Sequence, residues 1–159
     1  VLDNASSNIM ALNDNVVPYA STHGCGNNEW DVEATAAENY KTISNYYNAM
    51  QILWAAQGNI LIARDYAIVY WVNYVREGGA WDYKSNANYH NETFCYKYGG
   101  KSNQDHHVSW IGNYNYGYTG KVLFDLSMLH FGSSAVAGFD PKDKIEDWPA
   151  IDEGYYDAP

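Results

Sequence analysis

Basic residues are scarce in this chain. Only 9 of its 159 residues are Lys or Arg, against 19 Asp and Glu, which gives a net charge of −10 and a pI of about 4.6. Proteins that bind nucleic acid through its phosphates need a basic face, because phosphate neutralisation drives that binding. Nine basic residues spread over the whole chain form no obvious basic face. The composition therefore argues against a general nucleic-acid binder and leaves room only for a nuclease with a small local basic site.

The chain also lacks an uninterrupted hydrophobic run long enough to cross a bilayer. Its most apolar region, residues 52–75, contains Arg64 and Asp65, which are costly in lipid. We therefore expect soluble core helix in this region and no membrane contact. The content of 47% hydrophobic and 18% charged residues is typical of a globular protein. A chain of this length is most simply one compact domain, residues 1–159, with a core of its own.

Cysteine is limited to Cys25 and Cys95. A disulfide between them would close a loop of roughly 70 residues and stabilise the fold by about 4 kcal/mol in the chain-entropy model; two free buried thiols are the alternative. Asn4 and Asn91 each begin an N-glycosylation sequon. The even cysteine count, the sequons and the acidic composition favour a secreted, extracellular protein. The start at Val1 is what removal of a signal peptide would leave.

Helical periodicity dominates the first half of the chain. Residues 1–30 are rich in Asn, Ser and Gly without periodicity, which predicts an extended N-terminal arm. Apolar residues at spacings of three and four predict a helix that ends near residue 56, with Asp31 or Thr35 as its cap. A second helix is expected over residues 59–76, ended by a Gly-Gly pair.

The second half of the chain has a less regular pattern of apolar residues. Alternating apolar residues within 85–111 predict a small β-hairpin that includes Val108 and Trp110. Residues 113–120 look like a turn, after which Thr119 would cap a third helix. A loop and a short helical turn should follow. The expected class is mainly α with a small β-hairpin element, an α+β fold.

Two short segments combine glycines with aromatic and polar residues, namely residues 76–84 and 112–120. The chain has 16 Tyr and 6 Trp but only 4 Phe, and rings with a polar group suit half-wet surfaces such as sugar-binding clefts. A core would not need so many polar groups beside so many glycines. We therefore expect the two segments to meet in one site.

The same segments resemble the bacterial toxin 44 family of polymorphic toxins. That pattern reads approximately Val-Arg-x-Gly-Gly-x-Trp-Asp-Tyr-Lys, then Gly-Asn-Phe-Asn-Tyr-Gly-Ala-Thr-Gly, then an acidic tail with Pro that ends near Ile-x-x-Gly. The matching residues here are Val75, Arg76, Gly78, Gly79, 81–84, Gly112, Asn113, 115–117, Thr119, Gly120, Asp140, Pro141, Ile151 and Gly154. The match covers roughly residues 60–157. It departs at Ser109-Trp110, where family members often carry an acidic residue, and in a short linker after the third helix.

The resemblance implies an active site that harms bacteria, since members lie at the ends of secreted antibacterial toxins. It leaves a nuclease and a cell-wall hydrolase both open. Cleavage of a glycan needs two carboxyl groups, and Asp82 and Glu77 are our catalytic candidates. A carboxyl group among aromatic rings suits a general acid, and lysozyme-like folds also place a catalytic Glu at a helix end before a small β element. Alternatively, Glu77 is a solvated helix end and Asp82 binds backbone N–H groups of the turn.

Other residues of the two segments are candidates for substrate binding. Amide, hydroxyl and ammonium groups would position a polar substrate, and aromatic rings would stack on sugar faces; turn formation and helix capping are the alternative roles. These residues are Trp81, Tyr83, Lys84, Asn113, Asn115, Tyr116, Tyr118 and Thr119, with Tyr114 as a further stacking candidate.

Metal-binding patterns are weak. Asp105 precedes His106 and His107, but adjacent residues on a strand point to opposite faces and rarely bind one ion. Asp140, Asp143 and Asp147 lack the spacing of a calcium loop. We expect neither a metal nor another cofactor.

The leading hypothesis is a secreted, monomeric hydrolase that cuts the glycan strands of bacterial peptidoglycan, a muramidase or lysozyme. The runner-up is a metal-independent ribonuclease toxin, with His90, His106, His107 or His130 as acid–base group and Lys84 at the phosphate. A non-catalytic glycan-binding module is the third class.

Overall fold

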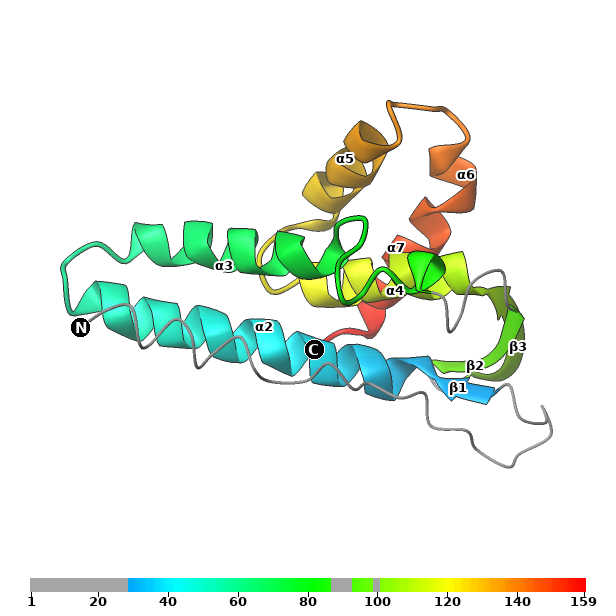
Figure 1. The fold of residues 1–159 in the computed structure, drawn as a ribbon, viewed down its shortest axis with the longest axis horizontal. Coiled ribbons are helices and arrows are strands. Elements are labelled where there is room, and N and C mark those ends of the chain that lie inside the picture. Colours follow the sequence, from blue (N-terminus) through cyan, green and yellow to red (C-terminus); the bar gives the residue numbers. More distant parts are fainter. Residues whose placement is uncertain (1–28, 87–92, 99–100) are drawn as a thin grey trace.

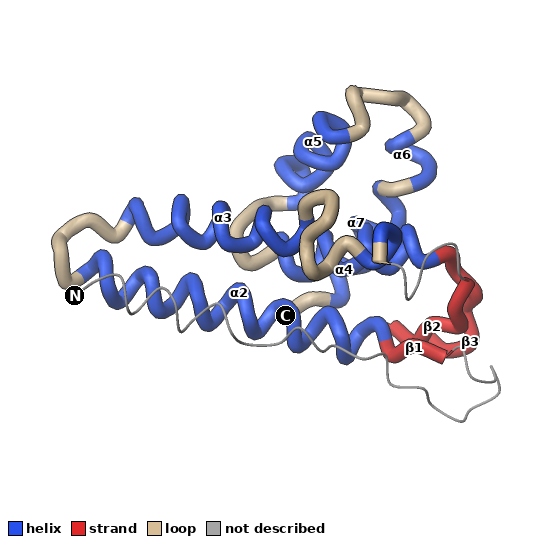
Figure 2. Tube along the Cα trace, in the orientation of Figure 1, coloured by secondary structure: helices blue, strands red, loops and turns tan. Residues whose placement is uncertain are grey.

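The computed structural model describes residues 29–86, 93–98 and 101–159. Helices dominate this part of the chain, with a small sheet at one end (Figures 1 and 2), so the predicted class, mainly α with a small β element, is confirmed. The helices are α2 (Val32–Ala55), α3 (Leu61–Val75), α4 (Val108–Gly120), α5 (Leu126–Val136), α6 (Asp143–Glu146) and α7 (Trp148–Asp157), and a short 3-10 helix, η2, covers Tyr83–Ser85. The strands are β1 (Glu29–Asp31), β2 (Thr93–Tyr98) and β3 (Lys101–His107).

The sheet has the order β1-β2-β3. Strands β2 and β3 form the expected antiparallel hairpin, with a register shift between Tyr96 and Tyr98. Strand β1 was not predicted: it runs parallel to β2, with Glu29 opposite Cys95. The last residues of the predicted N-terminal arm are therefore strand, and the rest of that arm lies outside the described residues.

Three residues of the secretion argument also lie outside the described part of the chain: Cys25, Asn4 and Asn91. Cys95 is buried beside β1. The disulfide itself stays a prediction.

The two long helices α2 and α3 lie side by side as an antiparallel hairpin (Figure 1), and both were predicted within a few residues. Asp31 caps α2, because its Oδ1 accepts a hydrogen bond from the Ala34 N–H at 2.9 Å. The buried faces consist mostly of apolar residues at helical spacing, which explains why apolar periodicity identified both helices.

Helix α4 is the main departure from the predicted structure. The predicted turn at residues 113–120 is helical, and Val108 and Trp110 begin this helix instead of continuing a strand. The glycines of the segment serve close helix packing. A Cβ atom on Gly117 would overlap the carbonyl oxygen of Ile151 on α7, and one on Gly154 would overlap the carbonyl oxygen of Tyr114.

Thr119 consequently lies inside α4 and caps no helix. Its hydroxyl donates to the Asn115 carbonyl oxygen at 2.7 Å and accepts from the Trp71 indole N–H at 2.9 Å. The next helix, α5, starts later than predicted and is capped by Asp125, whose Oδ1 accepts from the Met128 N–H at 2.9 Å.

One hydrophobic core joins these elements into a single domain. Helix α4 packs against α2, α3, α5 and α7, and residues of β1 and β2 extend the same core. Its largest fully buried side chains are Trp30, Tyr114, Ile43, Ile111, Leu129 and Ile151. Within the ranges described, no helix combines the length and apolar character that a bilayer span requires.

Candidate functional site

The loop after α3 has a geometry that requires both of its glycines. Gly78 has a φ of +70°, which side chains rarely adopt. A Cβ atom on Gly79 would overlap the carbonyl oxygens of Tyr74 and Asn73. The loop is closed by hydrogen bonds from the Trp81 N–H to the Tyr74 carbonyl oxygen at 2.9 Å and from the Gly79 N–H to Arg76 at 2.8 Å. The Gly-Gly pair therefore fixes the direction in which the next residues leave the helix.

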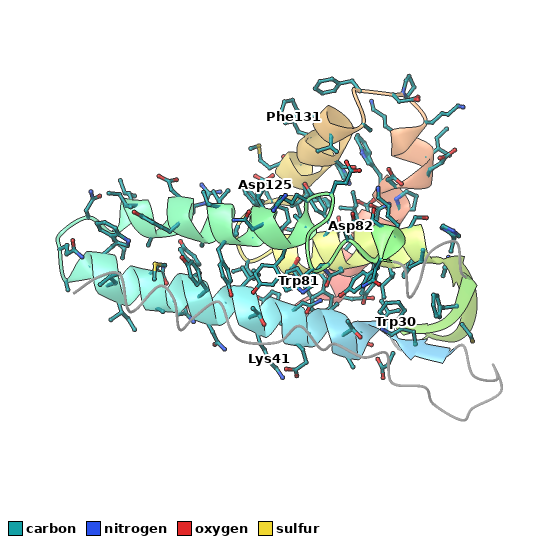
Figure 3. All side chains as sticks on the ribbon, in the orientation of Figure 1. Trp30, Lys41, Trp81, Asp82, Asp125 and Phe131 are labelled. Atoms are coloured by element: carbon teal, nitrogen blue, oxygen red, sulfur yellow. The ribbon has the colours of Figure 1, made fainter. Side chains whose placement is uncertain are left out.

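Asp82 is fixed in this loop. Its side chain is 8% exposed, and its Oδ2 accepts a hydrogen bond from the Gly78 N–H at 2.9 Å. The structure therefore bears out the alternative that Asp82 binds a backbone N–H group of the turn. The other carboxylate oxygen, Oδ1, accepts no hydrogen bond from the described residues. Figure 3 shows Asp82 and Trp81 near the end of α3, where the loop lies over α4.

Glu77 belongs to the same loop, one residue before Gly78, and it is exposed. It forms no hydrogen bond or ion pair with the residues that the structure describes. The neighbouring Arg76 is also exposed. The loop thus holds one buried, oriented carboxylate and one that is open to solvent.

Five of the predicted substrate-binding residues are buried, so direct contact of these side chains with a substrate stays a prediction that their position here does not support. They are Trp81, Tyr83, Asn115, Tyr118 and Thr119. Their rings and amide groups lack the accessible surface that stacking on a sugar would need. Trp81 instead packs on Tyr74, with ring centroids 4.4 Å apart.

A buried polar network holds η2 against the helices. The side-chain amide of Asn39, on α2, donates to the Tyr83 hydroxyl at 2.9 Å and to Asn115 Oδ1, on α4, at 2.8 Å. Sequence reasoning missed Asn39. The available signal was a polar residue within the apolar stripe that Ala36 and Ile43 define. The network positions the residues directly after Asp82.

Three other predicted residues remain accessible. Lys84 is exposed, and Asn113 and Tyr116 are partly exposed on α4. Asn113 donates from its amide to Asp147 Oδ1 at 2.7 Å, and the Tyr116 hydroxyl donates to the Leu129 carbonyl oxygen at 3.2 Å. Partners from α5 and the start of α7 therefore orient both side chains. The further stacking candidate, Tyr114, is fully buried.

A histidine–carboxylate pair joins α5 to α7. His130 Nε2 lies 2.6 Å from Asp152 Oδ1, with the two side chains 17% and 41% exposed. The imidazole ring stacks on Trp148, with centroids 4.0 Å apart and planes 3° from parallel. Asp152 was not singled out from the sequence, and 22 residues separate it from His130. Only the presence of His130 in a short list of acid–base candidates pointed to this pair.

The other histidines have different surroundings. His107 caps α4, because its Nδ1 accepts from the Ser109 N–H at 3.2 Å, and His106 stacks on Trp110. His90 lies outside the described residues. Among the residues with described positions, no three His, Cys, Asp or Glu side chains lie close enough together to hold a metal ion.

Comparison with known proteins finds no relative of this chain. No family model matches the chain, and no curated protein or solved structure matches it. The resemblance to bacterial toxin 44 and the analogy with lysozyme-like folds therefore stay predictions.

Proposed function

We propose that this protein is a secreted, extracellular hydrolase of the bacterial cell wall, most specifically a muramidase that cuts the glycan strands of peptidoglycan. The observation that carries the proposal is the loop after α3, which presents the oriented Asp82 carboxylate and the exposed Glu77 within six residues. Glycoside cleavage uses two carboxyl groups that flank the scissile bond. The resemblance to an antibacterial toxin family points to the same target.

In this proposal the two carboxyl groups divide the chemistry. One protonates the oxygen of the leaving sugar, while the other activates a water molecule or attacks the sugar carbon directly. The hydrogen bond from Gly78 to Oδ2 orients Asp82 and leaves Oδ1 for the reaction. Glu77 acts as the partner. The protein works without a cofactor and as a monomer.

Nearby polar side chains would hold the sugar residues. Asn113 and Tyr116 are oriented by Asp147 and Leu129, and Lys84 is exposed at η2. An acidic protein is repelled by an anionic wall, so Arg76 and Lys84 supply the local positive charge that the approach needs.

The test is mass spectrometry of the products after incubation with purified peptidoglycan, with an RNA sample in parallel. Fragments with muramic acid at the reducing end would support the proposal, and their loss in Asp82→Asn would assign the residue. The Asn side chain keeps an amide oxygen for the Gly78 N–H, so this variant removes the charge and keeps the hydrogen bond. An untouched wall beside cleaved RNA would refute the muramidase.

The second candidate is a metal-independent ribonuclease, and the His130–Asp152 pair favours it. A carboxylate that binds one imidazole nitrogen orients the ring so that the other nitrogen can transfer a proton. Here Nε2 faces Asp152, which leaves Nδ1 for the transfer. The proposal keeps Lys84 at the phosphate. RNA cleavage lost in His130→Ala but kept in Asp82→Asn would select the ribonuclease.

A non-catalytic glycan-binding module is the third class. It would bind peptidoglycan without releasing fragments, and Asp82→Asn would keep the affinity of the original protein. The same product analysis separates it from both enzymes.

A further inference from the structure

A row of aromatic rings follows the hairpin of α2 and α3. We call it the aromatic seam and define it by Tyr46 and Trp54 on α2 and Tyr66, Tyr70 and Tyr74 on α3. The three tyrosines of α3 are four residues apart and so share one face of that helix. Across the hairpin, the Trp54 and Tyr66 rings stack at 5.5 Å and the Tyr46 and Tyr70 rings at 3.9 Å.

The seam is continuous with the candidate site. Tyr70 contacts Tyr74 at 5.0 Å between centroids, and Tyr74 contacts Trp81 at 4.4 Å. Trp81 directly precedes Asp82. Figure 1 shows the outer half of the hairpin extending away from α4 and α7, so the seam leads from Asp82 along a projecting arm.

Core packing accounts for part of this row, since Tyr46, Tyr70 and Tyr74 are partly buried against the core. The buried stripe of α3 consists of Ala63, Ala67 and Trp71, each three residues before one of the seam tyrosines, so the two rows adjoin along the helix. Tyr66 is 47% exposed, and Val69 beside the seam is also exposed. The seam is thus a half-accessible strip rather than the hidden side of the hairpin.

The polar groups of the seam are neutral phenols and an indole. The Tyr70 and Tyr74 hydroxyl groups form a hydrogen bond at 3.0 Å. Burial, and then that hydrogen bond, raises the pKa of Tyr70 above its usual range, and burial followed by nearby Tyr66 raises the pKa of Tyr46. A strip of uncharged rings and hydroxyl groups matches the apolar faces and hydroxyl groups of sugars.

We propose that the aromatic seam binds the glycan strand of peptidoglycan beyond the cleavage point, so that the strand lies along the hairpin while its scissile bond is at Asp82. This inference rests on the proposed muramidase for the identity of the ligand. The seam residues on α3, from Tyr66 to Tyr74, span about 12 Å along the helix axis. The contacts on the aromatic seam increase the affinity for the glycan polymer, whereas Asp82 and Glu77 carry out the reaction.

The experiment measures binding of the full chain to purified, insoluble peptidoglycan by co-sedimentation. Asp82→Asn is the background, so that cutting does not remove the ligand. Adding Tyr66→Ala should lower the association constant about three- to tenfold, the effect of losing one aromatic contact. Tyr70→Phe, which removes only a hydroxyl group, should lower it less. The matched control is Tyr156→Ala on α7, because Tyr156 is 71% exposed and lies outside the seam.

Two further readouts separate this inference from the proposed function. In the otherwise unaltered protein, Tyr66→Ala should slow the release of glycan fragments from intact peptidoglycan more than it slows cleavage of a short soluble glycan fragment. Seam variants that bind the wall like the control would overturn the inference, even if the protein is a muramidase. Weaker wall binding in the seam variants, with no cleavage by any variant, would support the seam and refute the muramidase.

Discussion

The two hydrogen bonds of the Asn39 side chain allow the change in the free energy of unfolding on Asn39→Ala to be predicted. Asn39→Ala removes the donor to the Tyr83 hydroxyl and the donor to Asn115 Oδ1, both in the buried interior. One net hydrogen bond is worth about 1 kcal/mol, and a buried polar atom left unpaired costs about 1–3 kcal/mol. Asn115 Oδ1 would have no other donor among the described residues. The free energy of unfolding should therefore fall by about 2–4 kcal/mol.

Urea unfolding followed by tryptophan fluorescence measures this change. Tyr83→Phe, which removes one of the two bonds, should cost about 1 kcal/mol. Because the two side chains are in contact, the double variant should deviate from additivity by at least about 0.5 kcal/mol. Asn45→Ala is the control, since Asn45 is exposed on the same helix and should change stability by less than about 0.5 kcal/mol. A cost for Asn39→Ala no larger than that of the control would refute the reasoning.

Three further predictions follow from the same structure. Gly117→Ala should destabilise the protein by about 1–3 kcal/mol, because the methyl group overlaps α7, whereas Gly112→Ala in the same helix has open space and should be neutral or stabilising by up to about 1 kcal/mol; thermal unfolding compares them, and equal effects would contradict the close packing. The Ser127 hydroxyl and then the Met128 N–H lower the pKa of Asp125 from 3.8. The stabilisation by this cap is therefore complete above pH 3.8 and is lost as the pH falls through the lowered pKa. The gap in melting temperature between the original protein and Asp125→Ala should therefore be constant near neutral pH and shrink in strong acid, and a gap that widens there would contradict the assignment. On peptidoglycan, Asp82→Asn should lower kcat at least about 100-fold and Glu77→Gln should also lower it; unchanged rates in both variants would exclude the proposed carboxyl pair.

Local patterns in the sequence were sufficient for the helical hairpin. The apolar spacing of α2 and α3 reflects a buried stripe that each helix presents to the core, and Gly78 marks the end of α3 because its φ is positive. The cap at Asp31 follows from local chemistry as well. These features depend on residues within one or two helical turns, so one sequence can reveal them.

Features that depend on distant partners were not predictable in the same way. Gly117 looks like a turn residue until Ile151, 34 positions later, is known to lie against it. His130 and Asp152 form a pair only because α5 and α7 pack together. Trp81 and Tyr83 are residue types that are common in binding sites. Their burial, however, depends on α2, α4 and the rest of the core. Composition located the loop, but tertiary packing decided which of its side chains reach solvent.

The contact between α4 and α7 has a consequence for how the protein is made. Helix α7 begins 28 residues after α4 ends, and it supplies Ile151 and Gly154 to the close backbone contact with α4. During synthesis Gly117 of α4 therefore lacks its contact with Ile151 until the α7 segment has left the ribosome. The α2–α3 hairpin, built from contacts close in sequence, can form well before that. We expect a ribosome-bound chain that stops before residue 148 to be helical but open, sensitive to protease and without a closed core.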